Sequence, residues 1–261
     1  MTDEKSGERL AEGTLISHLL ELRDRLLRAV IGIVVVFVPA AIYRNEIFEF
    51  VAKPMLAQLP QGGSLIATGV MSPFLTPFKL AFIVAMFVAM PWVLYQIWAF
   101  VAPGLYRREK RFAVPLLVSS IALFYLGTFF AYHFVFPAAF HFFSHSGPSG
   151  VKLMPDINFY IDFAVRMFFG FGVAFEIPVV VVLLTLTGLV PVAKLSQARG
   201  YVIIGIFIVA AILTPPDPLS QLLMAVPMWL LYEGGVLMAR IMNRKPEAAV
   251  AESGGNQSGD A

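Results

Sequence analysis

The chain has 261 residues, of which 58% are hydrophobic and 14% are charged, with a formal net charge of +2. Soluble domains are typically about 45–50% apolar and about 25% charged, so this composition excludes a soluble or disordered protein. Because the sequence contains no cysteine, it also excludes disulfide scaffolds and thiol chemistry. The composition predicts an integral membrane protein of the all-α class.

Six apolar stretches are candidates for membrane-spanning helices, since a hydrocarbon core about 30 Å thick needs about 20 residues of helix. In chain order they cover residues 26–43, 78–101, 114–143, 159–186, 201–213 and 219–238. The third and fourth are long enough to tilt. The fifth reaches only about 20 Å at about 1.5 Å per residue, so it spans only where the membrane is thin or where it packs with the sixth.

Basic residues indicate how these spans are oriented. Most of the 19 Lys and Arg residues fall before the first span, in the second and fourth loops, and after the last span. By the positive-inside rule these segments are cytoplasmic, which puts both termini inside and makes the number of spans even. The first outer loop, residues 44–77, then contains a predicted amphipathic interfacial helix at 46–59.

The expected organisation is a cytoplasmic tail over residues 1–14, a six-span membrane domain over 15–240 and a cytoplasmic tail over 241–261. The C-terminal tail is predicted to be disordered because it is rich in small and polar residues. The first dozen residues mix acids with bases and have no apolar run, which argues against a cleaved signal peptide or a transit peptide.

The sequence contains no P-loop, no H-E-x-x-H motif, no G-x-S-x-G motif and no cysteine nucleophile. His141 and His145 are spaced to share a helix face, but no carboxylate completes a metal site. We therefore interpret them, and His133, as interfacial side chains. We expect no enzyme activity, no cofactor, no bound metal and no nucleic-acid partner.

Charged residues inside spans are informative because polar groups in lipid are costly and usually face a partner or a cavity. Glu176 has no acid or base within eight residues on either side. It is predicted to face a wet cavity or a polar ligand, and the alternative is a protonated Glu that hydrogen-bonds a neighbouring helix. Pro178, two residues later, is predicted to kink the helix.

Three further charged residues in the apolar stretches have structural interpretations. Asp162 and Arg166 are spaced i, i+4 with the acid first, so we expect a local ion pair. Glu233 lies about one turn from the inner end of the last span, where it is expected to extend toward the aqueous interface.

The connection between the fifth and sixth spans also carries polar residues. Asp217 followed by Pro218 fits a helix N-cap and the first helical residue, and a functional role for Asp217 is equally open. Gln221 lies one turn inside the sixth span. Its side-chain amide is expected to form an interhelical hydrogen bond, either within the chain or to another protein.

Two acids lie in basic surroundings on the predicted cytoplasmic side. Glu21 shares the polar face of an amphipathic segment with Arg25 and Arg28, so intrahelical pairing is expected. Glu109 lies inside the basic run at 107–111, where a surface ion pair is the simplest interpretation. From the residues alone, neither acid stands out.

Four segments, taken together, resemble the TatC family of the twin-arginine protein translocase. In chain order they are HLLELRDRL at 18–26, QIWAFVAPGLYRREKR at 96–111, FGVAFEIPVV at 171–180 and LTPPDPLSQ at 213–221. SPFLTPFKL at 72–80 and PLLVSS at 115–120 are similar to the family too. The resemblance covers about residues 18–240. It implies a concave six-span bundle with short fifth and sixth spans in a bacterial inner membrane, with both termini cytoplasmic.

This resemblance implies a function and a set of partners. Members of the family bind the paired arginines of signal peptides on folded precursor proteins at the cytoplasmic face. They recruit the single-span proteins TatB and TatA, assemble with other TatC copies, and support export driven by the proton-motive force. On this basis the protein is expected to be a translocase subunit in the lipid bilayer and not an enzyme.

The resemblance also implies roles for particular residues. Those implied for signal-peptide binding are Glu21, Arg23, Phe100, Pro103, Leu105 and Glu109. Glu176 is implied to face the concave pocket, Asp217 and Gln221 to dock partner helices, and Pro54, Ser72, Pro73 and Phe74 to form the outer-loop cap. Guanidinium groups bind carboxylates in bidentate geometry, which gives a physical reason for an arginine pair to be received by Glu21 and Glu109. The basic neighbours of Glu109 should repel such a peptide, and the sequence leaves their orientation open.

Two alternatives remain at this stage. A proton-coupled secondary transporter with Glu176 as the proton site would share the span count and the isolated acid, although paired broken helices are missing from the sequence. A structural scaffold that binds membrane partners but no peptide is the second alternative.

Overall fold

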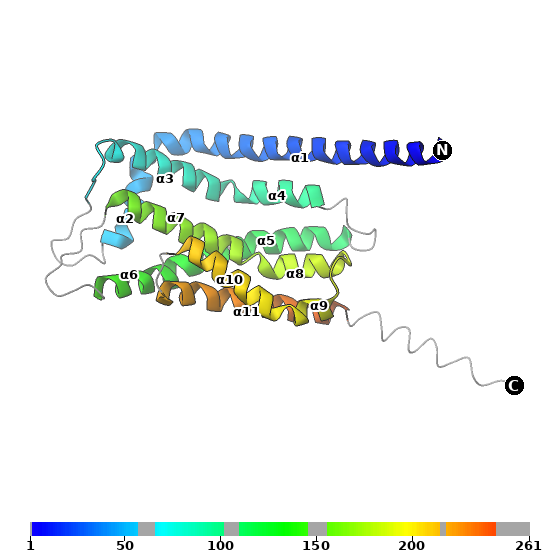
Figure 1. Cartoon of the computed structure of the whole chain (residues 1–261). Helices are drawn as coiled ribbons and strands as arrows, with labels where there is room; N and C mark the ends of the chain where they lie inside the picture. The colour runs from blue at the N-terminus through cyan, green and yellow to red at the C-terminus, as the bar shows by residue number, and fades with distance from the viewer. Residues whose placement is uncertain (1, 57–65, 102–109, 146–155, 215–217, 244–261) are drawn as a thin grey trace. The chain divides into compact units, whose positions relative to one another are not determined.

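The computed structural model describes residues 2–56, 66–101, 110–145, 156–214 and 218–243, and this part of the chain is helical almost throughout (Figure 1). Its one extended feature is an isolated bridge between Ile66 and Asp156. The expected all-α class is therefore confirmed. The chain divides into two compact units, the first made of residues 1–117 and 150–162 and the second of residues 118–149 and 163–261.

The first unit is built on a long N-terminal helix. Its helices are α1 (Thr2–Ile42), α2 (Arg44–Leu56), α3 (Ser72–Val88) and α4 (Met90–Val101), and α1 packs along both α3 and α4. The Trp92 indole on α4 donates from Nε1 to the backbone oxygen of Arg28 at 2.9 Å. A Cβ at Gly32 would lie 2.3 Å from the Trp92 ring, so this glycine lets the two helices approach. Helix α2 forms where an amphipathic helix was predicted, and its position at the interface stays a prediction.

The second predicted span is not straight. Helices α3 and α4 meet at Ala89 with a bend of 50°. Pro91, the second residue of α4, has no N–H to donate to the carbonyl oxygen of Phe87, so the hydrogen-bond ladder is interrupted at this point. The candidate span at 78–101 is thus formed by two helices, and Pro91 is the signal in the sequence for the bend.

The second unit contains the rest of the helical structure, with α5 and α7 beginning in the first unit. Its elements are α5 (Lys110–Phe130), the π-helix η2 (Ala131–Val135), α6 (Phe136–His145), α7 (Ile157–Ala174), α8 (Ile177–Leu186), α9 (Val192–Gln197), α10 (Arg199–Leu213) and α11 (Pro218–Asn243). Helices α7 and α8 are separated by a break at Phe175 and Glu176. Pro178 at the start of α8 cannot donate to the carbonyl oxygen of Ala174, so the predicted kink is confirmed.

The core of the second unit depends on glycines where helices cross. A Cβ at Gly127 on α5 would lie 2.5 Å from the backbone oxygen of Phe171 on α7. A Cβ at Gly172 would lie 2.6 Å from the Phe124 ring, which is 1% exposed. Phe171 itself is fully buried and packs against Phe130 with ring centroids 5.8 Å apart.

Among the described residues, four helices are long and apolar enough to cross a membrane. They cover residues 16–42, 113–139, 157–186 and 218–242, and the bent pair α3–α4 would make a fifth span. Helix α10, with 15 residues, is apolar but shorter. The short fifth stretch expected from the sequence is thus present as a helix. The count of six spans and the division into tails and membrane domain stay predictions.

Candidate functional site

One end of the α1–α4 contact involves Phe100 and the face of α1 that carries Glu21, two residues implied in signal-peptide binding. The His18 ring on α1 stacks on the Phe100 ring on α4, with centroids 4.3 Å apart and planes 20° apart. Glu21 lies three residues after His18, on the same face of α1. The stack therefore holds the last turn of α4 against the face of α1 that carries Glu21. Pro103, Leu105 and Glu109 lie outside the described residues.

Glu21 is already engaged in an ion pair. The Arg25 guanidinium donates from Nε at 3.0 Å and from Nη2 at 2.7 Å, both to Glu21 Oε1. The predicted intrahelical pairing is confirmed, with Arg25 as the partner. Arg23 points elsewhere and donates to its neighbour Asp24 at 3.0 and 2.8 Å. Arg23 and Glu21 are therefore not joined in the described structure.

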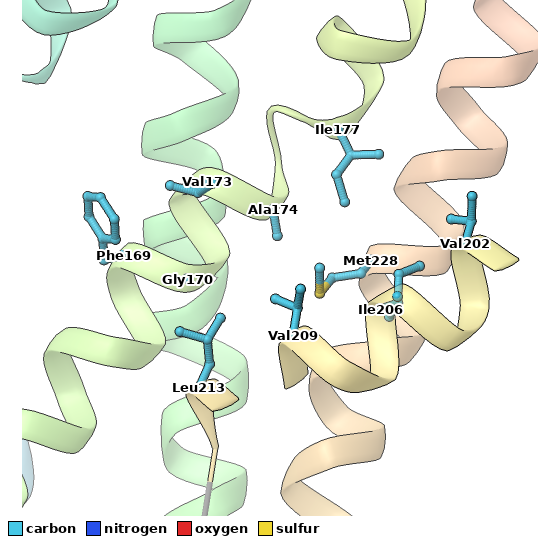
Figure 2. Close-up of a pocket in the computed structure, with 11 residues that line it drawn as sticks. Phe169, Gly170, Val173, Ala174, Ile177, Val202, Ile206, Val209, Leu213 and Met228 are labelled. Carbon is cyan, nitrogen blue, oxygen red and sulfur yellow. The ribbon is translucent and has the colours of Figure 1, made fainter. Parts of the chain in front are cut away.

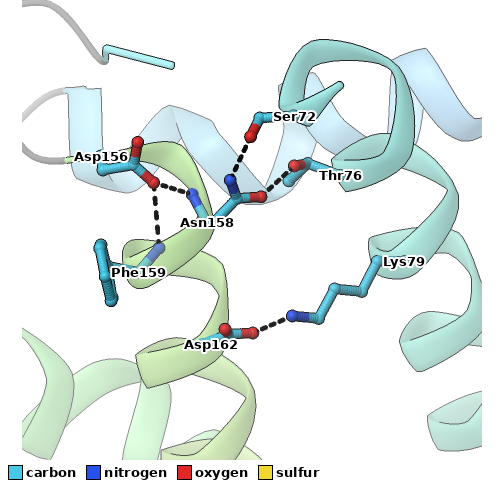
Figure 3. A network of polar contacts seen from close by, with 7 residues as sticks. All are labelled: Ser72, Thr76, Lys79, Asp156, Asn158, Phe159 and Asp162. Atoms are coloured by element: carbon cyan, nitrogen blue, oxygen red, sulfur yellow. Dashed lines mark hydrogen bonds and ion pairs between the residues drawn. The ribbon is translucent and has the colours of Figure 1, made fainter. Parts of the chain in front are cut away.

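A polar network joins Thr68, before α3, and α3 itself to the start of α7. Figure 3 shows the contacts between α3 and α7. Asp156 precedes the first residue of α7 and accepts hydrogen bonds from the backbone N–H and hydroxyl of Thr68, at 2.8 and 2.6 Å. It also accepts from the backbone N–H of Asn158 at 2.8 Å, as an N-cap does. The Thr68 hydroxyl and backbone N–H, followed by the N–H groups of α7, lower the pKa of Asp156 to about 2. The carboxylate therefore stays ionised at any physiological pH.

Asn158 extends this network to two residues of α3. Its side-chain amide donates to the Ser72 hydroxyl and accepts from the Thr76 hydroxyl. Ser72, one of the residues implied in the outer cap, is buried, whereas Pro73 and Phe74 are exposed. Pro54, also implied in the cap, lies within α2. The structure thus gives Ser72 a structural contact and gives Pro73 and Phe74 an open surface.

The ion pair expected between Asp162 and Arg166 is not formed. Asp162 instead pairs with Lys79 on α3 (Figure 3). A cation on the neighbouring helix reaches the carboxylate, so the tertiary contact replaces the local one. Within the part of the chain that is described, Arg166 has an exposed side chain and forms no hydrogen bond or ion pair.

Glu176 lies at the break between α7 and α8, where its side chain is partly buried. Its carboxyl group hydrogen-bonds with Ser120 on α5, and Oε1 is buried without a partner among the described residues. A hydrogen bond to a neighbouring helix is therefore present, as the alternative interpretation expected, whereas the wet cavity or polar ligand stays a prediction.

A pocket of about 500 Å³ opens near this break (Figure 2). It lies between α7, α8, α10 and α11, and the side chains of Ile177, Val202, Ile206 and Met228 line it. The lining is almost wholly apolar, and it includes Ile177 but not Glu176. The described pocket therefore suits an apolar chain or helix face and not a polar solute.

Glu233 pairs with Arg199, and its extension toward the aqueous interface stays a prediction. Arg199 at the start of α10 donates from Nε to Oε1 at 2.6 Å and from Nη2 to Oε2 at 2.8 Å. Beside this pair, the Tyr232 hydroxyl donates to the backbone oxygen of Leu195 at 2.7 Å. These contacts tie the start of α10 and the short α9 to α11. Arg199 binds the Glu233 carboxylate through two N–H groups, and it lies 34 residues before Glu233 in the chain.

Of the two residues implied in partner docking, Gln221 lies in the first turn of α11. The Gln221 side-chain amide donates from Nε2 to the backbone oxygen of Phe207 on α10 at 3.1 Å. The predicted interhelical hydrogen bond is confirmed, and it is formed within the chain. Helix α11 begins at Pro218, as expected of a first helical residue, whereas Asp217 lies outside the described residues.

Sequence reasoning did not single out His18, Thr68, Lys79, Ser120 or Asn158. Asp156 followed by Asn158 before an apolar run is an N-cap pattern that could have been noticed. Thr68 and Lys79 have partners 88 and 83 positions away, and Asn158 contacts Thr76 82 positions away, so no local pattern encodes such pairs. Among the described residues, no group of three or more possible metal ligands occurs, and His133 stacks on Phe129.

Comparisons with known proteins agree on one family. The family model described as Sec-independent protein translocase protein (TatC) matches residues 17–227. The TatC protein of Azotobacter chroococcum mcd 1 is 52% identical over 236 residues, covering 90% of this chain and 92% of that protein. The TatC protein of Escherichia coli K12 is 49% identical over 226 residues, covering 87% and 88%.

Solved structures give the same result. A crystal structure of the twin-arginine translocase receptor TatC superposes with a TM-score of 0.76 at 35% identity, covering 86% of this chain and 98% of that one. A second crystal structure of the same receptor, in the detergent DDM, has a TM-score of 0.78 and covers 85% and 99%.

Proposed function

This chain belongs to the TatC family of Sec-independent protein translocase proteins, and from that membership we propose that it is the receptor that binds twin-arginine signal peptides. The observation that carries the proposal is the family match over residues 17–227. Family membership favours a translocase subunit over the proton-coupled transporter. The protein is accordingly a transport component and not an enzyme.

The proposed recognition site is the cytoplasmic end of the α1–α4 contact. Glu21 and Glu109 supply the carboxylates for the two arginines, because a guanidinium donates two parallel N–H groups to a carboxylate. Phe100, Pro103 and Leu105 supply the apolar wall, and Arg23 is proposed to act beside the site from a neighbouring face of α1, where it pairs with Asp24. The stack of Phe100 on His18 supports this site, because it holds the end of α4 against the face of α1 that carries Glu21, and Glu109 follows the last residue of α4 by eight positions in the sequence.

Partner docking is proposed for the start of α11. Gln221 donates its amide N–H within the chain, which leaves its carbonyl oxygen available to a polar group on a partner helix. Asp217 precedes it. The proposed partners are the single-span proteins TatB and TatA and further TatC copies. Glu176 is proposed to face the concave pocket of the bundle. The proton-motive force, and not nucleotide hydrolysis, is the proposed energy source.

The remaining parts of the proposal concern location. We assign the protein to a bacterial inner membrane with both termini in the cytoplasm, because the basic segments then obey the positive-inside rule. Pro54, Ser72, Pro73 and Phe74 form the proposed cap on the outer side. The hydrogen bonds of Ser72 and Thr76 to Asn158 support a cap that is held in one conformation.

Peptide binding to the detergent-purified protein tests the recognition site. A fluorescent signal peptide containing Arg-Arg is titrated against the wild type and against Glu109→Ala, with a Lys-Lys peptide in parallel. We expect both changes to weaken binding about tenfold, which corresponds to about 1.4 kcal/mol. The matched control is Glu49→Ala, which removes an exposed acid from α2. If the Arg-Arg and Lys-Lys peptides bind alike and Glu109→Ala has no effect, the proposed site is wrong.

A further inference from the structure

The Glu21 carboxylate, which the proposed function assigns to a signal-peptide arginine, already holds an arginine of its own chain. Arg25 donates two N–H groups to Glu21 Oε1, at 3.0 and 2.7 Å. Among the described residues, Glu21 Oε2 accepts no hydrogen bond. The two side chains are 36% and 21% exposed, so an incoming ligand can reach the pair from solvent.

Arg25 offers the carboxylate the same chemistry as the ligand. Both are guanidinium groups, and both bind through charge-assisted N–H donors. The acid precedes the base by one helical turn, which is the favourable order for such a pair. Because Arg25 is tethered to the same helix, it binds Glu21 without the entropic cost of association that a free peptide has.

The other nearby basic residues do not have this role. Arg23 donates to Asp24 and points away from Glu21. Arg28 lies seven residues after Glu21, and its contact with α4 is through its backbone oxygen. Within the described part of the chain, Arg25 is thus the cation that contacts Glu21.

We propose that Arg25 is an intramolecular competitor that occupies Glu21 in the unliganded protein, and that a signal-peptide arginine binds by displacing it. Exposed ion pairs one turn apart are weak, so displacement is readily reversible. The competition lowers the affinity for every cationic ligand. It keeps the receptor from retaining adventitious arginine-rich peptides and helps it to release the signal peptide.

This inference rests on the proposed function, and one set of titrations separates the two. The Arg-Arg peptide is titrated against the purified wild type and four variants: Arg25→Ala, Glu21→Gln, Arg25→Ala with Glu21→Gln, and Arg28→Ala. Arg25→Ala removes the competitor and also one positive charge that repels the cationic peptide. We therefore expect this variant to bind the peptide about three- to fivefold more tightly. Arg28→Ala removes an equal charge from the same helix without freeing Glu21, so it should have a smaller effect.

Two further readouts distinguish competition from a structural effect. Arg25→Ala should no longer tighten binding once Glu21 is Gln, because the competitor then has no carboxylate to release. The Lys-Lys peptide should gain affinity by the same factor as the Arg-Arg peptide, since displacing Arg25 is a cost common to both. Misfolding cannot mimic a gain in affinity.

Each outcome bears on the proposal. If Glu21→Gln weakens binding while Arg25→Ala leaves it unchanged or weaker, the competitor is overturned and the receptor function stands. If Glu21→Gln does not affect binding, Glu21 is not part of the recognition site, and the competitor is overturned together with that assignment. An equal gain in affinity in Arg28→Ala would also overturn the proposal, because the gain would then come from the lower positive charge of α1 and not from the release of Glu21.

Discussion

Asp156 joins parts of the chain that are 88 residues apart, through two hydrogen bonds from Thr68. Asp156 is 9% exposed, and its carboxylate is kept ionised by N–H and O–H donors and not by a cation. A carboxylate with several such donors has a depressed pKa because protonation would break these bonds. This one carboxylate therefore holds the segment before α3 against the start of α7 as long as it is ionised.

Replacing Asp156 with Asn should lower the thermal stability of the detergent-solubilised protein, because the amide cannot accept all of these bonds. The pKa is depressed to about 2 from 3.8. The stabilisation is thus fully present above about pH 4 and is lost as the pH falls toward 2. We expect the difference in Tm between wild type and Asp156→Asn to be largest near neutral pH and to shrink below pH 4.

Thermal unfolding at several pH values, followed by circular dichroism, measures this difference. Glu49→Gln is the matched control, since it removes an exposed acid from α2 and should give no such pH dependence. A difference in Tm that stays constant between pH 7 and pH 2.5 would contradict the role of the Asp156 carboxylate.

Other residues mark the limit of what the sequence predicts. The pair of Glu21 with Arg25 was predictable because a helix places residues four apart side by side. The pairs of Asp162 with Lys79 and of Glu233 with Arg199 were not, since their partners lie 83 and 34 positions away. Both acids were given local or solvent-exposed interpretations because a sequence displays only its own neighbours.

At the scale of helices, close crossings depend on particular glycines. Gly127 and Gly205 are both helical glycines of the second unit, but their surroundings differ. A Cβ at Gly127 would meet the backbone oxygen of Phe171 at 2.5 Å, whereas a Cβ at Gly205 would meet nothing within 4 Å. The obstacle at Gly127 is backbone and cannot rotate away.

Gly127→Ala should therefore destabilise the protein by about 1–3 kcal/mol, as overpacking of a tight contact does. Gly205→Ala should be neutral or stabilising by up to about 1 kcal/mol, because alanine favours the helix. Chemical unfolding in mixed micelles measures both. Equal effects of the two substitutions would mean that α5 and α7 are not in close contact at this crossing.

The helices also indicate which features of the fold can be predicted from hydropathy. The positions of the apolar helices were predictable because a lipid-spanning segment must be apolar over about 20 residues. The break before Pro178 was predictable from its missing N–H. The similar bend before Pro91 was not predicted, although the same argument applies, because an uninterrupted apolar run hid it.

At the scale of the whole molecule, orientation in the membrane can be tested directly. The chain contains no cysteine, so any introduced cysteine is the only one present. We expect Ser6→Cys and Ser253→Cys to react with a membrane-impermeant maleimide only after the cells are permeabilised. Ser149→Cys, in the second predicted outer loop, should react in intact cells. Labelling of Ser253→Cys but not of Ser6→Cys in intact cells would instead require an odd number of spans.

The length of α10 has a consequence for the surrounding lipid. Its 15 residues extend about 22 Å at about 1.5 Å per residue, against a hydrocarbon core of about 30 Å. If α10 spans the membrane, the bilayer beside it must become thinner or one end of the helix must remain in hydrocarbon. Burying the backbone groups of a helix end in lipid is costly, so we expect local thinning, which would shorten the path of a translocated cargo.

Fluorescence quenching by lipids brominated at different depths distinguishes these cases. Single labels at Gly200→Cys and Ile212→Cys, near the two ends of α10, should both be quenched best by bromines close to the headgroups. A label at Leu230→Cys, exposed in the middle of α11, is the deep control. If one α10 label is quenched as deeply as the control, the helix end lies in hydrocarbon and the membrane beside it has normal thickness. Adding four leucines to the middle of α10 would lengthen it by about 6 Å. In this lengthened variant both end labels should lie near the headgroups of a bilayer of normal thickness. Comparing export by the lengthened variant and the wild type would then show whether thinning contributes to export.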